Sequence, residues 1–252
     1  MTSESALFKV TGLRKSYDGH AVLDGVDFEV LRGESLVILG RSGSGKSVTL
    51  RQLIGLEPCD SGSVTFDGEE ITRLSEKALQ PMRRRVSMLF QSGALFDSLN
   101  VFDNVAYPLR ERGEIGEDEL AGKVRDTLAL VQLEGADDKL PSELSGGMRK
   151  RAALARSLVV QPEAVLFDEP TTGLDPMTAA TIGALIVRAR EKLGMTSVIV
   201  SHDLALLRRV AERVAFLEAG KLRFVGTLEE AESSDDRLLR RFLAGEEEDD
   251  AA

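Results

Sequence analysis

A glycine- and serine-rich segment at residues 40–47 constrains the fold of this chain more than any other part of its sequence. It reads Gly-Arg-Ser-Gly-Ser-Gly-Lys-Ser, which fits the pattern G-x-x-x-x-G-K-[ST], and it directly follows the apolar run 35–39. Its glycines allow backbone N–H groups to turn inward on a phosphate, and a helix expected from Lys46 would point its positive end at the same anion. The segment therefore predicts a strand–loop–helix unit that binds the phosphates of a nucleotide.

The charge and composition of the chain exclude several other classes of protein. A formal charge of −10 over 252 residues opposes nonspecific binding to nucleic acid or to an anionic lipid surface. The single cysteine, Cys59, rules out an intramolecular disulfide and a cysteine-cluster metal site, which fits a reducing compartment. Residues 1–6 lack the basic and apolar regions of a signal peptide, and no apolar run approaches the roughly 20 residues of a membrane span. We therefore expect any membrane role to require docking on a protein that spans the bilayer.

Apolar runs and helical patterns along the chain predict an α/β fold with a largely parallel sheet. Strand-like runs alternate with longer helical patterns over much of the chain, as in a parallel sheet that is covered on both faces. The earliest runs are short and close together, which is typical of an antiparallel sheet. Between residues 91 and 162 no strand pattern appears, and apolar residues recur at helical spacing from residue 117 onward. We expect strands at 7–10, 28–30, 36–39, 64–66, 86–90, 164–167, 197–200, 214–217 and 222–225.

Two adjacent carboxylates, Asp168 and Glu169, end a purely apolar run at residues 165–167. Carboxylates at the tip of a buried strand are costly unless a cation or a reaction uses them. Asp168 fits the residue that holds Mg²⁺, directly or through water, and Glu169 fits the general base that polarises an attacking water. In isolation such a pair more often ends a strand as a solvated acidic turn. The phosphate loop upstream favours the catalytic interpretation.

A second glycine segment, Ser145-Gly146-Gly147, precedes a strongly helical run at residues 149–160. Ser145 is a good N-cap residue, so by itself the segment predicts only a capped helix. Its two glycines also leave bare amides at a helix N-terminus, which is a second place for an anion. Because one loop already surrounds the phosphates of a bound nucleotide, a second such loop indicates a composite site. In that site the loop of one protomer closes on the nucleotide of another.

The order and spacing of these segments resemble the ATP-binding subunit of an ABC transporter, over residues 7 to about 227. The resemblance implies the ABC ATPase fold, which is a P-loop NTPase (RecA-like) core with a parallel sheet, an antiparallel β subdomain and an α-helical insertion at about 92–161. The matching motifs are the Walker A loop at 40–47, the Q-loop at Gln91, the LSGGQ signature at Ser145-Gly146-Gly147, Walker B at 165–169, the D-loop at 173–175 and the H-loop at His202.

The resemblance also implies a role for each candidate residue, with ATP and Mg²⁺ as cofactors. Catalytic roles are implied for Gln91, Glu169 and His202, and metal ligation is implied for Ser47, Gln91 and Asp168. Contacts with the nucleotide are implied for Tyr17, which would stack on adenine, and for Gly40, Arg41, Ser42, Gly43, Ser44, Gly45, Lys46, Ser47, Val48, Ser145, Gly146, Gly147 and Asp175.

A narrower resemblance, to the Mla/Mce-type phospholipid-transport ATPases, rests on Met148 and on residues 90–105. Met148 replaces the glutamine that usually ends the ABC signature, and the same replacement is found in that group. In the ABC fold the segment after the Q-loop lines the groove that receives a coupling helix of the permease. Its apolar residues are expected either in that socket or, alternatively, in the core of the helical insertion; they are Leu95, Phe96, Leu99, Val101 and Phe102.

This narrower resemblance implies an ATPase that drives phospholipid transport between inner and outer membranes and maintains the lipid asymmetry of the outer membrane. The alternative is the ATPase of an ABC importer or exporter for another solute, such as amino acids or drugs. The partners implied are a second copy in an ATP-sandwich homodimer, integral-membrane permease subunits, an MCE-domain lipid-binding protein and a small STAS-like subunit, without nucleic acid. The location implied is the cytoplasmic face of the inner membrane, where the chain is peripheral through the permease.

We therefore expect three segments along the chain. The ABC ATP-binding domain occupies residues 7–227, and a helical C-terminal extension follows at 228–245. Residues 246–252 form a block of like charge that cannot bury itself, so they are expected to be a disordered acidic tail.

Overall fold

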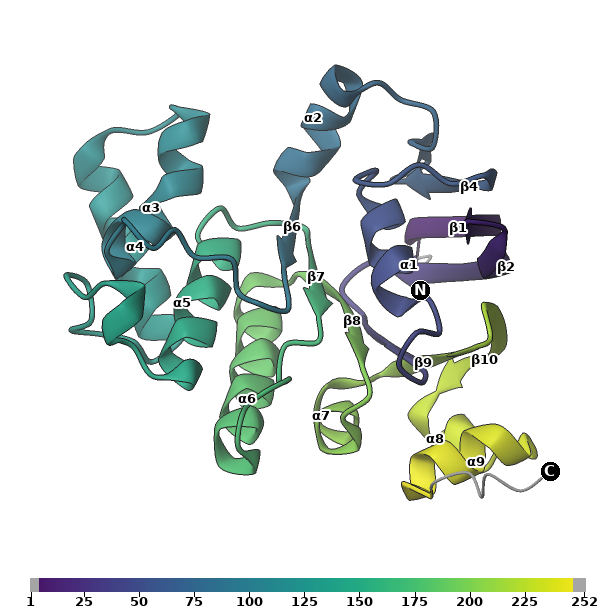
Figure 1. The fold of residues 1–252 in the computed structure, drawn as a ribbon. Helices are drawn as coiled ribbons and strands as arrows, with labels where there is room; N and C mark the ends of the chain where they lie inside the picture. Colours follow the sequence, from purple (N-terminus) through teal and green to yellow (C-terminus); the bar gives the residue numbers. More distant parts are fainter. Residues whose placement is uncertain (1–4, 247–252) are drawn as a thin grey trace. The chain divides into compact units, whose positions relative to one another are not determined.

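A computed structural model of the chain describes residues 5–246. These residues form two compact units, one from the described parts of 1–83 and 198–252 and the other from 84–197 (Figure 1). Apart from Glu246, the acidic tail expected at residues 246–252 lies outside the described residues. None of the helices within residues 5–246 has the length and hydrophobicity that a bilayer span requires.

The first unit contains an antiparallel sheet, which is built from β1 (Ala6–Tyr17), β2 (His20–Leu31), β4 (Ser61–Phe66) and β5 (Glu69–Glu70). The strand order is β2-β1-β4-β5, and Figure 1 labels the first three of these strands. β1 and β2 form a hairpin through Asp18 and Gly19, whose φ angles of 49° and 80° suit the tight turns that match strand twist. The rings of Phe8 and Phe66 face each other across the β1–β4 pair, with centroids 5.1 Å apart.

A second sheet carries the phosphate loop. Its strands in the first unit are β3 (Ser35–Leu39), β9 (Arg213–Glu218), β10 (Lys221–Thr227) and the last four residues of β8 (Thr196–Ser201), in the order β10-β9-β3-β8. β3 and β9 are parallel, β9 and β10 are antiparallel, and every residue of β3 is buried. The associated helices are α1 (Lys46–Leu53), α2 (Glu76–Arg85), α7 (Leu204–Val210), α8 (Leu228–Glu232) and α9 (Arg237–Ala244).

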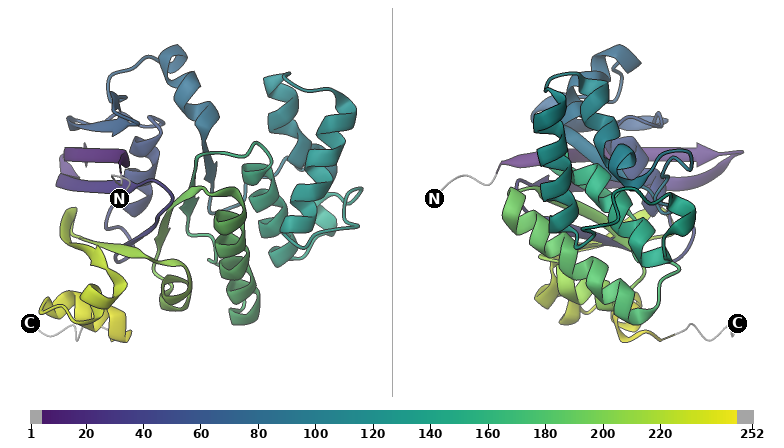
Figure 2. Two further views of the ribbon diagram at one scale, coloured as in Figure 1. Left: turned by 180° about the vertical axis from the view of Figure 1, so that it is seen from behind. Right: turned by 90° about the vertical axis from the view of Figure 1, so that its left-hand side faces the viewer.

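The second unit combines two parallel strands with helices (Figure 2). Strands β6 (Val86–Leu89) and β7 (Ala164–Asp168) pair so that Leu89 lies opposite Phe167. Along the chain between them lie α3 (Val101–Arg112), α4 (Glu117–Leu130), the 3₁₀ helix η1 (Pro141–Glu143) and α5 (Gly146–Leu158), while α6 (Pro176–Leu193) follows β7. The apolar stripe of α4 is buried, as its helical spacing predicts; it includes Leu120, Val124 and Leu128.

The predicted combination of a parallel sheet, an antiparallel sheet and helices is confirmed. Two local features differ from the sequence patterns. β1 and β2 each extend over 12 residues, because polar side chains on their exposed faces hide the strand pattern beyond a few apolar positions. Helix α2 was not predicted, since it contains Pro81 and buries only Leu79 and Met82.

Candidate functional site

The phosphate loop joins β3 to α1 and requires glycine at two positions. Gly40 has a φ of 156°, and a Cβ atom there would lie 2.2 Å from the carbonyl oxygen of Leu217. Gly45 has a φ of 102°, and a Cβ atom there would lie 2.7 Å from Cδ2 of Leu23. Gly45 is also the N-cap residue of α1, where no side chain accepts a hydrogen bond from the first turn. The N-terminal amides of α1 are therefore not used by a side-chain cap, which suits the binding of an anion.

Lys46 places its ammonium group inside this loop. Its Nζ atom lies 2.8 Å from the carbonyl oxygen of Gly40 and 2.8 Å from that of Arg41, and the residue is only 6% exposed. Within the described structure, the buried Oγ of Ser44 has no hydrogen-bond partner, which is uncommon for a native hydroxyl. The other predicted residues of the segment are the half-buried Ser47 and Val48 and the exposed Arg41, Ser42 and Gly43. A cation, helix amides and hydroxyls thus come from one short segment, as phosphate binding requires.

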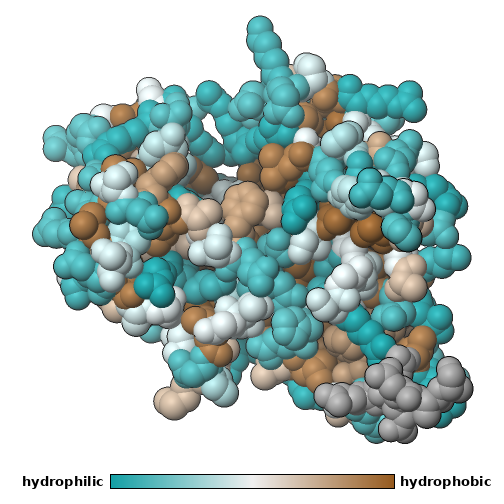
Figure 3. Space-filling model, viewed as in Figure 1, coloured by the Kyte–Doolittle hydropathy of each residue, from teal (hydrophilic) through white to brown (hydrophobic). Residues whose placement is uncertain are grey.

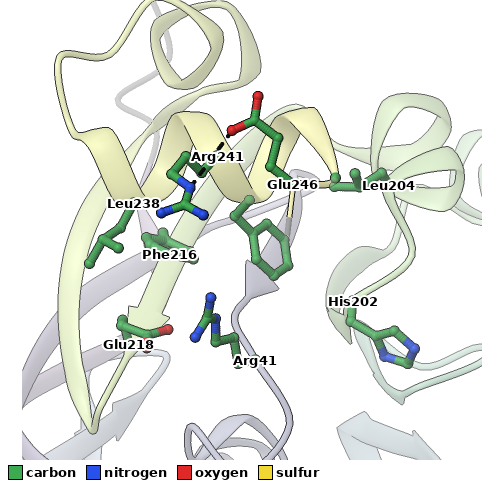
Figure 4. A pocket seen from close by; sticks show the side chains of 10 residues that line it. Arg41, His202, Leu204, Phe216, Glu218, Leu238, Arg241 and Glu246 are labelled. Carbon is green, nitrogen blue, oxygen red and sulfur yellow. Dashed lines mark ion pairs between the residues drawn. The ribbon is translucent and has the colours of Figure 1, made fainter. Parts of the chain in front are cut away.

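Arg41 and His202, which are far apart in the sequence, line one pocket of the first unit (Figure 4). This pocket has a volume of about 530 Å³, and helix α9 contributes to its wall. α9 is held against β9 by a ring contact between Phe216 and Phe242, whose centroids are 5.4 Å apart. In Figure 4 the Arg41 side chain points toward α9, whereas His202 lies below Leu204. Two predicted site residues are therefore brought together beside a helix for which we predicted no site.

Tyr17, the predicted adenine-stacking residue, ends β1 at the surface of the first unit. The residue is 39% exposed, and its hydroxyl donates a hydrogen bond to the carboxylate of Glu57. The Nζ atom of Lys15 lies 5.3 Å from the ring centroid. These two contacts hold an aromatic ring in place where a planar group from solvent can reach it.

Asp168 and Glu169 lie at the carboxyl end of β7 in the second unit, and both are buried. Glu169 has a φ of 48°, a left-handed conformation that is uncommon for a residue with a side chain and is often found at functional sites. The hydroxyl of Thr172 lies 3.3 Å from Oε2 of Glu169 and helps to orient the carboxylate. Because β6 runs parallel to β7, Gln91 leaves the sheet at the same edge as the carboxylate pair. The structure thus brings three predicted residues to one strand edge.

The backbone of Gln91 is held by a residue that the sequence patterns did not reveal. Lys150 of α5 is 8% exposed, and its Nζ donates a hydrogen bond of 2.5 Å to the carbonyl oxygen of Gln91. Burial lowers the pKa of Lys150, while the negative charges of Asp168 and Glu169 raise that pKa. Lys150 precedes the buried Leu154 by four residues, so the two side chains lie on the same face of α5. A lysine on the apolar face of a predicted helix was therefore the one sign in the sequence that this residue has a special role.

The second glycine segment opens α5, as predicted. The Oγ of Ser145 is the N-cap acceptor and lies 3.2 Å from the backbone nitrogen of Met148. A Cβ atom on Gly147 would lie 2.5 Å from Cγ2 of Thr178, whereas one on Gly146 would meet only Cδ2 of Leu174 at 3.6 Å. Gly147 is therefore required by close packing against α6.

Asp175 caps the N-terminus of α6 and connects it to this glycine segment. Its Oδ1 accepts hydrogen bonds from the backbone nitrogens of Met177 and Thr178 at 3.1 and 3.0 Å, and its Oδ2 accepts one from the Thr178 hydroxyl at 2.5 Å. These bonds, with the Thr178 hydroxyl contributing most, lower the pKa of Asp175. Since Thr178 also touches the position of Gly147, the two predicted segments are linked through one threonine.

The segment after Gln91 is organised by a second residue that we did not predict, Asn104. Its fully buried amide accepts a hydrogen bond from the Phe96 nitrogen at 2.8 Å and donates to the carbonyl oxygens of Phe96 and Leu99 at 3.0 and 2.8 Å. Phe96 is 42% exposed and packs against Tyr107, with ring centroids 4.7 Å apart.

Val101, which was expected either in the permease socket or in the core, is buried in α3, so it belongs to the core rather than to a surface socket. On the face seen in Figure 3, hydrophobic side chains are interspersed with hydrophilic ones over the helices of this unit.

Comparison with known proteins identifies a family. A family model described as ABC transporter matches residues 23–172. The intermembrane phospholipid transport system ATP-binding protein MlaF of Escherichia coli K12 is 42% identical over 224 residues, which are 89% of this chain and 83% of MlaF. MlaF of Haemophilus influenzae is 40% identical over 240 residues, which are 95% of this chain and 91% of that protein. The probable ribonucleotide transport ATP-binding protein mkl of Mycobacterium tuberculosis H37Rv is 42% identical over 237 residues; the match spans 94% of this chain but 66% of the mycobacterial protein.

Solved structures agree with this similarity. A dimeric post-hydrolysis state of the ATP-binding cassette MJ0796, bound to ADP and Pi, is 31% identical, with a TM-score of 0.81 over 88% of this chain and 98% of that one. The structure of cbiO1 from Clostridium perfringens, part of the ABC transporter complex cbiONQ, is also 31% identical, with a TM-score of 0.84 over 95% of this chain and 96% of that one.

Proposed function

Because this chain belongs to the ABC transporter family and is an ATP-binding ABC ATPase cassette, we propose that it is the ATP-hydrolysing subunit that drives phospholipid transport between inner and outer membranes. The observation that carries this proposal is the identity of 40% and 42%, over most of the chain, to proteins named for intermembrane phospholipid transport. In this role the chain would help to maintain the lipid asymmetry of the outer membrane.

The geometry of each unit supports a different role in hydrolysis: the first unit would bind the nucleotide, and the second would activate the attacking water. In the first unit, Lys46 and the N-terminal amides of α1 would hold the β- and γ-phosphates, with Tyr17 against adenine and His202 toward the γ-phosphate. In the second unit, Glu169 would take a proton from the attacking water as general base. Its burial and its hydrogen bond to Thr172 support this role, because both restrict the direction of the carboxylate.

Mg²⁺ fits the chemistry of the predicted ligands, which are the hydroxyl of Ser47, the amide oxygen of Gln91 and the carboxylate of Asp168. These are hard oxygen donors, and Mg²⁺ in such sites is bound by few protein ligands together with phosphate oxygens. Within residues 5–246 no group of three or more His, Cys, Asp or Glu is placed to hold a metal. A bound Mg²⁺ would supply charge neutralisation on the β- and γ-phosphates.

The second glycine segment has no lysine or arginine of its own to hold a phosphate. It therefore supports a homodimer in which each copy completes the nucleotide site of the other. Ser145, Gly146 and Gly147 of one copy would contact the nucleotide held by the phosphate loop of the next, with Asp175 beside them. The solved relative MJ0796 is a dimer bound to ADP and Pi. Hydrolysis would remove the bridging γ-phosphate and thereby release the closed state.

We propose that this dimer works under integral-membrane permease subunits at the cytoplasmic face of the inner membrane, without nucleic acid. The half-exposed Phe96 and Tyr107, fixed by Asn104, would be part of the surface that receives the permease. An MCE-domain lipid-binding protein and a small STAS-like subunit would complete the assembly. A second candidate function, transport of another solute, is favoured by the name of the mycobacterial relative, which refers to ribonucleotides.

Phospholipid transport and transport of another solute can be distinguished by isolating the intact assembly from its native membrane. The proteins and lipids that accompany this chain are then identified. Phospholipid transport predicts a permease, an MCE-domain protein and bound phospholipid. A solute-binding protein without an MCE-domain protein would contradict the lipid function and leave the ATPase assignment intact. An assembly without any membrane protein would contradict transport altogether.

A further inference from the structure

Lys150 is a buried cation that the hydrolysis scheme above does not use. It lies on α5, five residues after the N-cap Ser145, and is 8% exposed. Moving an ammonium group out of water is costly unless other groups compensate for the lost hydration. The hydrogen bond to the Gln91 carbonyl occupies one N–H group but brings no net negative charge. Further compensation has to come from anionic groups close by.

Those anionic groups are the carboxylates at the end of β7. Asp168 and Glu169 are the two residues whose charges act favourably on the Lys150 ammonium. The Lys150 side chain borders a small void together with Leu89, Phe167 and Pro170, at the ends of β6 and β7. Phe167 and Pro170 directly flank the carboxylate pair in the chain. Lys150 therefore lies beside the residues that flank the two carboxylates in the chain.

We propose that Lys150 is a positioning residue for ATP hydrolysis, which holds the backbone at Gln91 in a fixed place relative to the carboxylates of Asp168 and Glu169. The inference rests on the proposed hydrolytic function, and it adds a residue to which no motif assigns a role. A charged donor suits this task because hydrogen bonds from an ionised group are roughly twice as strong as neutral ones. The same charge is attracted by the carboxylates, so one side chain links the two segments.

Because Lys150 lies on α5, its contact with Gln91 would transmit movement of that helix to the backbone at Gln91. α5 begins at the glycine segment proposed to close on the nucleotide of a second copy. A displacement of α5 on closure would move the Lys150 ammonium and with it the Gln91 carbonyl. Lys150 would thus report closure at one nucleotide to the water- and metal-binding residues of the neighbouring site.

The test compares three variants of the full-length chain in the assembly that it forms with its permease. Lys150→Met keeps the length of the stem and removes the charge, whereas Lys150→Arg keeps both a charge and donors. Lys192→Met is the matched control, because Lys192 is an exposed lysine on α6 of the same unit. ATP affinity, KM for ATP, kcat and the thermal midpoint Tm are measured for each.

A misplaced catalytic group costs rate rather than binding, so Lys150→Met is expected to lower kcat by about 10- to 100-fold. ATP affinity and KM are expected to stay within about twofold, since the groups proposed to hold the phosphates lie in the phosphate loop and α1. The Tm of Lys150→Met is expected to fall, because removing one partner of a buried charge interaction leaves the carboxylates and the Gln91 carbonyl uncompensated, so kcat is measured well below the Tm of the variant. Lys150→Arg should recover most of the rate, and Lys192→Met should change none of these quantities.

Two results would overturn the inference. An unchanged kcat in Lys150→Met would show that the lysine does not position the catalytic groups. A parallel fall of kcat and Tm that Lys150→Arg fails to reverse would show a purely structural role. If the unmodified assembly hydrolyses no ATP, the proposed function fails first, and that outcome differs from a normal rate that is insensitive to Lys150.

Discussion

Two glycine-containing segments of this protein each precede a helix, yet they differ in whether a side chain caps the N-terminus of that helix. The segment before α1 ends in Gly45, offers no side-chain cap and carries its own cation, Lys46, folded back over the loop. The segment before α5 begins with Ser145, which uses its hydroxyl to cap the helix. No side-chain cation is part of that second segment. The first segment is therefore equipped to hold phosphate alone, and the second is equipped only to add to a phosphate held elsewhere.

The glycines of the two segments also serve different physical purposes. Gly40 and Gly45 have backbone conformations that residues with side chains rarely adopt. Gly147 has no such conformation, and its missing side chain makes room for Thr178. The first segment is thus specified by local backbone geometry and the second by packing against α6. Substitutions should therefore affect nucleotide binding through one segment and association of copies through the other.

The largest expected effect is on nucleotide binding by the first segment. Lys46→Ala removes a buried cation from the loop and should weaken ATP binding by about 10- to 100-fold, the range for a lost hydrogen bond to a charged group. Fluorescence titration of the purified chain with a labelled ATP analogue measures this change. Lys192→Ala, at an exposed lysine, is the control and should bind normally. An unchanged ATP affinity in Lys46→Ala would contradict the conclusion that the first segment, unlike the second, binds phosphate through its own cation.

The sequence could specify this first segment almost completely, because its information is local. A strand, a glycine loop and a helix lie in one continuous stretch, so the motif predicted the placement of Lys46. The burial of Leu120 and Val124 followed from helical spacing in the same way. These are features that a periodic pattern or a backbone requirement determines without reference to distant residues.

The contacts around the second segment could not be predicted, because they join residues that only the fold brings together. Thr178 approaches Gly147 from another helix, and Lys150 reaches the backbone of Gln91 across the helical part of the chain. Asn104 holds a loop through its side-chain amide, which resembles any polar helix residue in the sequence. Tertiary packing selects such residues, and a single sequence records only their polarity.

A smaller effect is expected from Gly147→Ala, which tests the packing role of the second segment. The added methyl would collide with Thr178, and overpacking of this kind costs about 1–3 kcal/mol. We expect ATP affinity of the single chain to persist, while the ATP-dependent dimer weakens by about 5- to 100-fold. Sedimentation with ATP measures the dimer in a Glu169→Gln background, which is expected to bind ATP without hydrolysing it.

The chain offers both a control and a rescue for this variant. Gly122→Ala in α4 adds a methyl that no atom outside its own turn of the helix approaches within 4 Å, so the dimer should be unaffected. Thr178→Ser removes the colliding methyl and keeps the hydroxyl that bonds to Asp175, so it should restore the dimer of Gly147→Ala. A dimer that remains weak in the double variant would contradict the steric explanation.

The smallest expected effect concerns the charge of Asp175, which holds Thr178 in place. Hydrogen bonds from Thr178 lower the pKa of Asp175 below its ordinary value of 3.8, so folding favours the ionised carboxylate. The stabilisation is complete above the unfolded pKa and is lost as pH falls through the lower folded pKa. Asp175→Asn keeps a good N-cap acceptor, so its Tm should be only slightly lower at neutral pH. The difference from the unmodified chain should disappear in acid.

Carboxyl NMR titration of Asp175 tests this charge directly, because the predicted pKa lies below 3.8. The Thr178→Ala variant removes the hydroxyl that contributes most to the shift, so it should return the pKa of Asp175 toward 3.8. Thr178→Ser removes the methyl alone and Thr178→Ala removes the methyl and the hydroxyl together, so comparing them distinguishes the two contacts that Thr178 makes. Thr178→Ser should leave the pKa low and relieve Gly147→Ala, whereas Thr178→Ala should relieve the collision and raise the pKa. A pKa that is at or above 3.8 in the unmodified chain would mean that Asp175 does not fix Thr178, and the position of the second segment would then depend on Gly147 alone.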